Sequence, residues 1–152
     1  LFQGKTGLGK THLSLAIAYQ LVQQGRSVLY TSAQGLVDRY ERLRFDKSPT
    51  SDDEDFVALA PQCDLLILDD LGAEFSNSFS LSVLYNVLND RLMARKPVLL
   101  STNLEPPQLS SAYGERIASR ILCDFVAYTF CGNDIRLEKR KRELLTVGPS
   151  KE

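Results

Sequence analysis

Residues 4–11 read Gly-Lys-Thr-Gly-Leu-Gly-Lys-Thr, and this stretch decides what kind of fold the chain adopts. It fits the pattern G-x-x-x-x-G-K-[ST] of loops that wrap the phosphates of a nucleotide. Glycines allow the tight turn that aims several backbone N–H groups at one phosphate. In such a loop the lysine, here Lys10, reaches the β- and γ-phosphates, and the hydroxyl of Thr11 holds Mg²⁺. The alternative is a glycine-rich turn that binds nothing.

The loop is expected to connect a strand to a helix. Apolar residues from Leu13 to Leu21 predict a helix whose N-terminal N–H groups face the phosphates, and Gly25 fits the position just after its end. Only Leu1 and Phe2 precede the loop region, although such a loop follows a strand of about five residues. We therefore expect the chain to begin inside that strand and to lack an N-terminal region of the native protein.

Length and composition indicate one domain with a substantial core. The chain has 152 residues, 43% of them apolar, and a formal net charge of −1. This charge argues against a protein that coats nucleic acid, although a local basic patch stays open. The sequence contains no signal peptide and no apolar run of membrane length. We expect no membrane association and a cytoplasmic location.

The cysteines predict neither a disulfide framework nor a metal site. Cys63, Cys123 and Cys131 lack C-x-x-C spacing, and His12 is the only histidine. We expect three buried free thiols in a reducing compartment.

Short apolar runs alternate with helical stretches along the rest of the chain. Strands are expected over 27–31, 64–68, 97–101 and 125–130, helices over 34–45, 53–60, 80–95, 113–122 and 135–145, and a loop over 46–53. Such alternation produces a parallel sheet with helices on both faces. The expected fold class is therefore α/β, a three-layer sandwich around a central parallel sheet.

A second motif follows roughly sixty residues after the loop. The apolar run 65–68 ends in Asp69 and Asp70, which suits the second motif of a nucleotide site. There the first carboxylate binds Mg²⁺, directly or through water, and the next polarises the attacking water. In the alternative reading, the two aspartates merely cap the next element.

Further polar residues follow later strands. Asn103 comes directly after the run 97–101, where ligands of open α/β sheets bind, so it is placed to orient a water or touch the γ-phosphate. It could equally open a loop.

Two arginines lie on a predicted helix further along the chain. Arg116 and Arg120 share one helix face, and arginine stabilises charge on a transferring phosphoryl group. Both arginines, and likewise Arg136, could equally be solvated surface residues.

Together these motifs resemble the AAA+ ATPase domain of the DnaC/DnaI helicase loaders and the related IstB transposition ATPases. The resemblance covers nearly the whole chain, so residues 1–152 are expected to form one AAA+ ATP-binding domain of the P-loop NTPase (ASCE) class. Its most specific pieces are GKTGLGKTHLSLAIA, CDLLILDDLGAE, LLSTNLEP, GERIASRI and GNDIR.

The resemblance implies a role for each matching residue. It implies that Asp69 and Thr11 hold Mg²⁺ and that Asp70 activates the water. It implies that Asn103 is the sensor-1 residue and that Arg120 is an arginine finger reaching the ATP of a neighbouring subunit; Arg116 should matter less. The expected ATP-binding set is Gly4, Lys5, Thr6, Gly7, Leu8, Gly9, Lys10, Thr11, His12 and Arg136, the last at the sensor-2 position.

Two departures from the wider AAA+ pattern bear on activity. Asp70 stands where most AAA+ proteins have a glutamate, which suits slow, switch-like hydrolysis as in the loaders. Only a short tail follows the last predicted strand, so the chain offers no helical lid domain, which weakens the expected contact between Arg136 and the nucleotide.

The function implied is ATP-dependent loading of a replicative helicase onto single-stranded DNA, with ATP and Mg²⁺ as cofactors, nucleotide-dependent self-assembly and slow ATP hydrolysis. Initiator-type ATPases insert a DNA-touching helix in the segment that here holds Arg39, Arg42, Arg44 and Lys47, although these arginines also fit a solvated helix face. The alternatives are an IstB-like transposition helper ATPase, a P-loop small-molecule kinase and a nucleotide-dependent scaffold without turnover.

Overall fold

A five-stranded parallel sheet forms the centre of the molecule. The computed structural model describes residues 1–46, 48–72 and 77–146. The strands lie in the order β2-β3-β4-β1-β5, and every pairing is parallel. Their bounds are β1 Phe2–Gln3, β2 Val28–Ser32, β3 Leu65–Leu71, β4 Val98–Thr102 and β5 Tyr128–Thr129.

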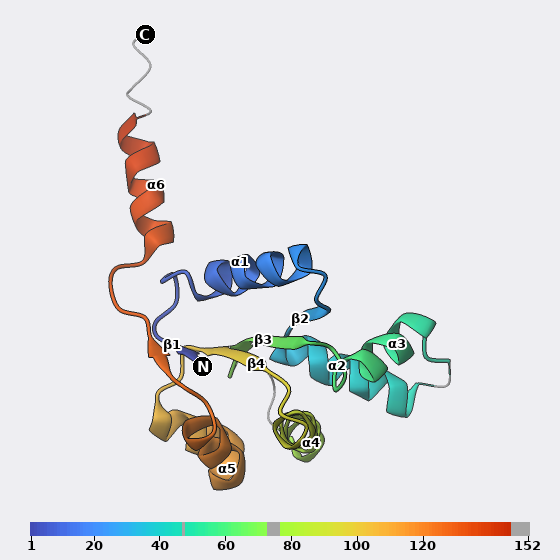
Figure 1. Cartoon of the computed structure of the whole chain (residues 1–152). Helices are drawn as coiled ribbons and strands as arrows, with labels where there is room; N and C mark the ends of the chain where they lie inside the picture. Colours follow the sequence, from blue (N-terminus) through green and yellow to red (C-terminus); the bar gives the residue numbers. More distant parts are fainter. Residues whose placement is uncertain (47, 73–76, 147–152) are drawn as a thin grey trace.

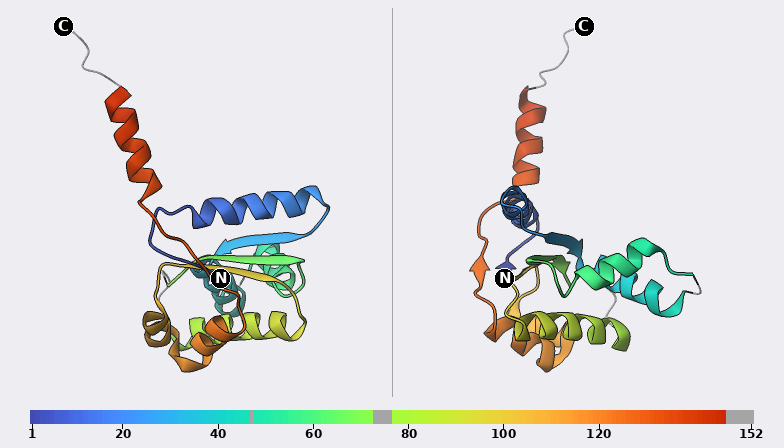
Figure 2. Two further views of the ribbon diagram at one scale, coloured as in Figure 1. Left: turned by 60° about the vertical axis from the view of Figure 1, so that its left-hand side comes forward. Right: turned by 45° about the vertical axis from the view of Figure 1, so that its right-hand side comes forward.

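Helices cover both faces of the sheet, as Figure 1 shows. Their bounds are α1 Lys10–Gln23, α2 Ala33–Phe45, α3 Ser51–Leu59, α4 Ser78–Met93, α5 Pro106–Cys123 and α6 Ile135–Thr146. α1 packs on one face, α2, α4 and α5 pack on the other, and α3 lies against α2 (Figures 1 and 2). α6 projects away from the body. The predicted α/β three-layer sandwich is therefore confirmed.

The apolar run of β3 divides the core into two parts. Leu66 and Leu68 pack with α2, α4 and α5, whereas Leu65 and Ile67 pack with α1. Successive side chains of a strand point to opposite faces, so a strand covered on both sides is apolar throughout. All four of these residues are buried, as the sequence predicted.

Two predicted elements, β5 and α5, differ most from the structure in length. β5 is limited to two residues because its one described partner, β1, is itself two residues long. α5 begins at Pro106, seven residues before the predicted start, because proline fits the first turn of a helix and Gln108 accepts a hydrogen bond from the N–H of Glu105. Gly114, with φ 73° and ψ 163°, interrupts the helix and separates its two halves.

The expectation of three buried thiols is wrong for two of them. All three cysteines are free, but Cys123 and Cys131 are exposed because the end of α5 and the stretch after β5 lie at the surface. Cys63 alone is buried. Among the described residues, no helix is both long and apolar enough to cross a membrane.

Candidate nucleotide-binding site

A cavity of about 550 Å³ lies at the carboxyl ends of the strands, where α/β sheets bind ligands. It is lined by Thr6, Gly7, Leu8, Gly9, Lys10, Thr11, His12, Leu15, Asp70, Asn103, Ile135 and Arg136. The structure thus brings together the glycine-rich loop, one carboxylate of the Asp-Asp pair, the asparagine after β4 and the arginine of α6. Gly4, Lys5 and Asp69 lie next to these residues rather than on the cavity wall.

The glycines of the loop occupy backbone conformations that other residues avoid. Gly7 and Gly9 have φ values of 80° and 90°, and Gly9 directly precedes the first residue of α1. A Cβ atom on Gly7 would lie 2.2 Å from the carboxyl group of Asp134. The loop therefore needs glycine at position 7 for conformation and for space.

Lys10 is folded back onto its own loop. Its side chain is buried, and Nζ donates hydrogen bonds to the carbonyl oxygens of Gly4 (2.6 Å) and Lys5 (2.9 Å). Burial lowers the pKa of Lys10 from its ordinary value, while the charges of Asp70 and Asp69 oppose that shift. The ammonium is thus held at the base of the loop, beside two carboxylates.

Asp69 is buried at the end of β3 and accepts hydrogen bonds from three hydroxyl groups. Oδ1 accepts from the Ser101 hydroxyl, and Oδ2 accepts from the Tyr30 hydroxyl at 2.6 Å; Thr11 also donates to this carboxylate. Burial pushes the pKa of Asp69 upward, but these hydrogen bonds outweigh it, so the pKa lies below its ordinary value. Asp69 is therefore held as a carboxylate.

The contact between Thr11 and Asp69 fits a magnesium site. A hydroxyl and a carboxylate, both hard oxygen donors, meet there at the edge of the cavity. Mg²⁺ binds in proteins through one or two carboxylates together with substrate phosphates. These two residues are the ones that the sequence singled out for the metal.

Asp70 differs from Asp69 in both backbone and exposure. Its φ is 53°, which is uncommon for a residue other than glycine, and its side chain is exposed at the cavity. Its N–H donates to the Ser101 hydroxyl at 3.1 Å. Ser101 therefore contacts both aspartates, and Asp70 lies on the wall of the cavity.

The start of α6 is fastened to the glycine-rich loop. The N–H of Ile135 donates to the carbonyl of Gly7 at 2.9 Å, and Oδ1 of Asp134 accepts from the N–H of Arg136 at 2.9 Å. This junction brings Arg136 to the cavity although no helical lid is present among the described residues.

The structure does not bring Arg120 to the cavity of its own chain. Arg120 lies on the second half of α5, where Nη2 is 3.4 Å from the Tyr85 hydroxyl and Nη1 is 3.8 Å from Oδ2 of Asp124. Arg116 contacts the same tyrosine, with Nη2 2.8 Å from its hydroxyl. The two arginines therefore share one environment, which the spacing in the sequence did not reveal.

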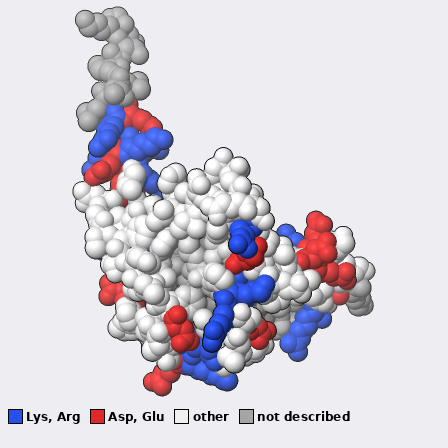
Figure 3. Space-filling model, viewed as in Figure 1, with Lys and Arg blue, Asp and Glu red and all other residues white. Residues whose placement is uncertain are grey.

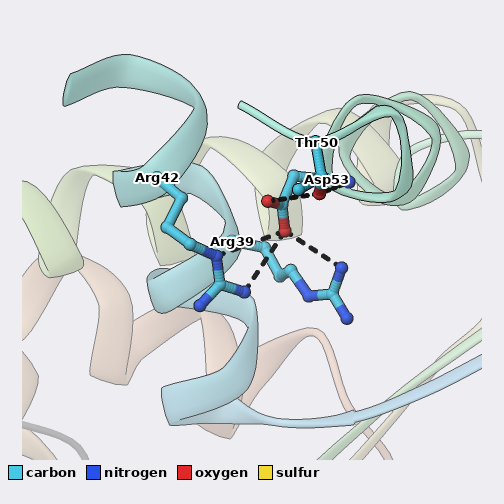
Figure 4. Close-up of polar contacts among 4 residues, drawn as sticks. All are labelled: Arg39, Arg42, Thr50 and Asp53. Carbon is cyan, nitrogen blue, oxygen red and sulfur yellow. Dashed lines mark hydrogen bonds and ion pairs between the residues drawn. The ribbon is translucent and has the colours of Figure 1, made fainter. Parts of the chain in front are cut away.

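Two of the arginines expected to contact DNA have an intramolecular partner. Figure 4 shows Arg39 and Arg42 of α2 converging on the buried Oδ1 of Asp53 in α3, at 3.0 and 3.2 Å. The Thr50 hydroxyl donates to the other oxygen of this carboxylate at 2.8 Å.

The third arginine, Arg44, contacts aromatic rings, and the start of the nearby helix α3 is acidic. Arg44 lies against the rings of Phe45 and Phe79, at 5.4 and 5.5 Å from their centroids. The first turn of α3 carries three acidic residues, and Figure 3 shows acidic side chains gathered at that edge. DNA binding by Arg39, Arg42 and Arg44 stays a prediction, and Lys47 lies outside the described residues.

Sequence reasoning missed four residues of the site. Tyr30 and Ser101 hold Asp69, while Leu15 and Ile135 line the cavity. Ser101 lies near the end of β4, the strand next to β3, and Asn103 directly follows that strand, so the strand order would have indicated Ser101. Tyr30 carries no such signal, because its contact crosses from the middle of β2 to the end of β3.

Comparisons with known proteins match the chain to an ATP-binding family. The model of the family described as IstB-like ATP binding protein matches residues 1–141. The replicative helicase loader DnaC of Escherichia coli strain K12 is 27% identical over 121 residues, which make up 80% of this chain and 49% of that protein. The chain thus spans about half the length of the curated relatives it matches.

Solved structures show the same fold. The crystal structure of the DnaC helicase loader aligns with a TM-score of 0.73 and 23% identity, over 86% of this chain and 76% of that chain. AMPPCP-bound DnaA from Aquifex aeolicus aligns with a TM-score of 0.73 and 22% identity, over 99% and 46% of the two chains. The likeness shows that the chain shares the fold of these proteins, in agreement with the fold class that the motifs predicted.

Proposed function

The chain belongs to the family of IstB-like ATP binding proteins, and we propose that it is an ATPase that binds Mg-ATP in the cavity described above. One observation carries this proposal. The glycine-rich loop, the Thr11–Asp69 contact, Asp70 and Asn103 all lie at one cavity. Separate stretches of sequence supply these groups, and each group has the chemistry that one step of phosphoryl transfer needs.

Each residue has a distinct task in the proposed binding step. The N–H groups of the loop and the ammonium of Lys10 bind the phosphates, for which Lys10 exchanges its carbonyl partners for phosphate oxygens. Thr11 and Asp69 would hold Mg²⁺, which supplies charge neutralisation at the β- and γ-phosphates. Tyr30 and Ser101 orient Asp69 for that task by fixing its two oxygens.

In the proposed hydrolysis, Asp70 and Asn103 orient the attacking water. Its oxygen forms a bond to the γ-phosphorus, the bond to the β–γ bridging oxygen breaks, and ADP and phosphate result. Asp70 accepts the proton that the water loses, and Arg136 stabilises the charge on the phosphoryl group. Arg120 supplies a second cation from a neighbouring copy, because it lies away from the cavity of its own chain.

We further propose that ATP binding serves the loading of a replicative helicase onto single-stranded DNA in the cytoplasm, with nucleotide-dependent self-assembly. The similarity to the replicative helicase loader DnaC supports this proposal. The second candidate is a transposition helper ATPase, which the match to the IstB-like family favours. Both functions use the same fold and site.

One assay tests the proposal and separates its two versions. The ATPase rate of the purified protein is measured against protein concentration, alone, with single-stranded DNA, and with the replicative helicase of its own host. A helicase loader predicts a slow basal rate that rises more than linearly with concentration and increases further with helicase and DNA. Stimulation by a transposase encoded next to the gene, and none by helicase, would favour the helper ATPase. Absence of ATP cleavage under every condition would contradict the enzyme.

A further inference from the structure

Tyr85, in the middle of α4, contacts two guanidinium groups at once. Its hydroxyl accepts hydrogen bonds from Arg116 at 2.8 Å and from Arg120 at 3.4 Å. The Cζ atoms of the two arginines lie 4.1 and 5.2 Å from the centroid of its ring, within the range of a cation–π contact. One tyrosine thus holds both arginines through two kinds of interaction.

This arrangement counters a repulsion that the helix itself creates. Arg116 and Arg120 are four residues apart on α5, and like charges at this spacing repel each other. A hydroxyl that accepts from both groups and a ring face that attracts both cations keep them together. The ring of Tyr85 also packs against the larger apolar core, which fixes the position of the ring.

The cluster keeps an excess of positive charge. Asp124 lies 3.8 Å from Arg120 and is itself about half exposed, and no carboxylate within the described ranges forms an ion pair with Arg116. Tyr85 is neutral when its hydroxyl is protonated, so it orders the two guanidinium groups without cancelling their charge. A surface of this kind favours an incoming anion such as a phosphate group.

We propose that Tyr85 is a positioning residue that holds the guanidinium of Arg120 ready for the γ-phosphate of ATP bound by a second copy of the chain. This inference rests on the proposed function, in which Arg120 acts on a neighbour's nucleotide. Tyr85 does not touch the nucleotide. Its effect passes through the orientation of Arg120, and displacing a catalytic group by about 1 Å can cost on the order of 100-fold in rate.

A mixing experiment tests the inference. The donor, Lys10→Ala, keeps Tyr85 and Arg120 but binds ATP weakly, so at low ATP concentration its own site stays largely empty. The receiver, Arg120→Ala, binds ATP but lacks the arginine. Each variant alone should be nearly inactive, and their mixture should regain ATPase activity. Adding Tyr85→Phe to the donor keeps the ring and removes the hydroxyl. We therefore expect the ATPase rate of the mixture to fall roughly tenfold, within the range expected for a displaced catalytic group. Tyr85→Leu in the donor should lose more.

Two matched controls replace a tyrosine by phenylalanine in the other partner or at another position. Tyr85→Phe in the receiver should cost far less than in the donor, because the receiver supplies no arginine. Tyr19→Phe in the donor, at an exposed tyrosine of α1, should leave the mixture unchanged. A purely structural role would lower activity equally in either partner and would lower the melting temperature of the Tyr85→Phe protein.

The outcomes separate this inference from the proposed function. If the simple mixture is active and the Tyr85 variants of the donor are as good as the unchanged donor, Arg120 keeps its role and the inference about Tyr85 is wrong. If the simple mixture gains no activity, the action of Arg120 on a neighbour is wrong, and the inference falls with it. If Tyr85→Leu fails to fold, the activity of the mixture with Tyr85→Phe in the donor still tests the inference about Tyr85.

Discussion

The Tyr30 hydroxyl donates a 2.6 Å hydrogen bond to Oδ2 of Asp69, which joins the middle of β2 to the end of β3 at the edge of the cavity. Burial and this contact with Asp69 raise the pKa of Tyr30, so the phenol stays protonated and remains a donor at neutral pH. The hydrogen bond leaves Asp69 fixed in orientation, with the Ser101 hydroxyl on its other oxygen.

Replacing Tyr30 by phenylalanine removes this donor and keeps the ring. We expect Mg²⁺ to bind roughly 10–100-fold more weakly in the presence of ATP, the usual cost of losing a hydrogen-bond partner of a metal ligand. A magnesium titration of ATP binding measures the effect. Tyr19→Phe on α1 is the matched control, and an unchanged magnesium dependence in Tyr30→Phe would exclude a role for Tyr30 in orienting Asp69 for the metal.

Asp70→Asn separates binding from cleavage. The amide keeps the size of the side chain but cannot take a proton from water, so ATP affinity should persist while the ATPase rate falls on the order of 10²–10⁴-fold, as for loss of a general base. Calorimetry and single-turnover hydrolysis give the two quantities. A wild-type rate in this variant would assign the task to another carboxylate, such as Glu74, which lies outside the described residues.

Asp53 should make the stability of the protein depend on pH. The Thr50 hydroxyl and then Arg42 and Arg39 hold the pKa of Asp53 below its ordinary value of 3.8, against the opposing effect of burial. The stabilising contribution is therefore fully present above pH 3.8 and is lost as the pH falls through the lowered pKa of the folded state.

Asp53→Asn should accordingly lower the free energy of unfolding at neutral pH, and its difference from the unchanged protein should shrink in acid. Denaturant unfolding at stepped pH values measures both. Asp55→Asn, an exposed residue of the same helix, is the control and should change little. A difference that grows toward acid would contradict the lowered pKa.

Arg91 is a fully buried cation that serves the fold. Its guanidinium donates to the carbonyl oxygens of Ala60 (2.8 Å), Cys63 (3.0 Å) and Pro97 (2.7 Å), which ties the end of α3 to the start of β4. Arg91→Met would leave these buried acceptors without partners, so we expect a loss of about 3 kcal/mol in the free energy of unfolding. Arg95→Met, at an exposed position, should cost far less, and equal effects would contradict the assignment.

The parts of the site that the sequence predicted are those in which local spacing determines the geometry. The turn at Gly7 and Gly9 and the start of α1 follow from neighbouring residues, and the apolar run before Asp69 identifies a buried strand. Because parallel strands end at one edge, Asn103 could be assigned to that edge as well.

The remaining parts depend on contacts between distant segments, which spacing does not specify. The partner of Arg39 and Arg42 is Asp53, on the far side of the loop between α2 and α3, and a helix pattern alone shows both arginines as solvated. Likewise, Tyr85 meets Arg120 only after α4 and α5 have packed on the same face of the sheet.

The most direct test of the account is the binding of Mg-ATP to the unchanged protein and to Lys10→Ala, measured by isothermal titration calorimetry. We expect one site per chain, and an affinity about 10–100-fold weaker in the variant, because charge-assisted hydrogen bonds contribute about 1.5–3 kcal/mol. Lys141→Ala on α6 should bind as the unchanged protein does, and all three proteins should have similar melting temperatures. Equal ATP affinity in Lys10→Ala, or no binding to any of the three proteins, would contradict the nucleotide site.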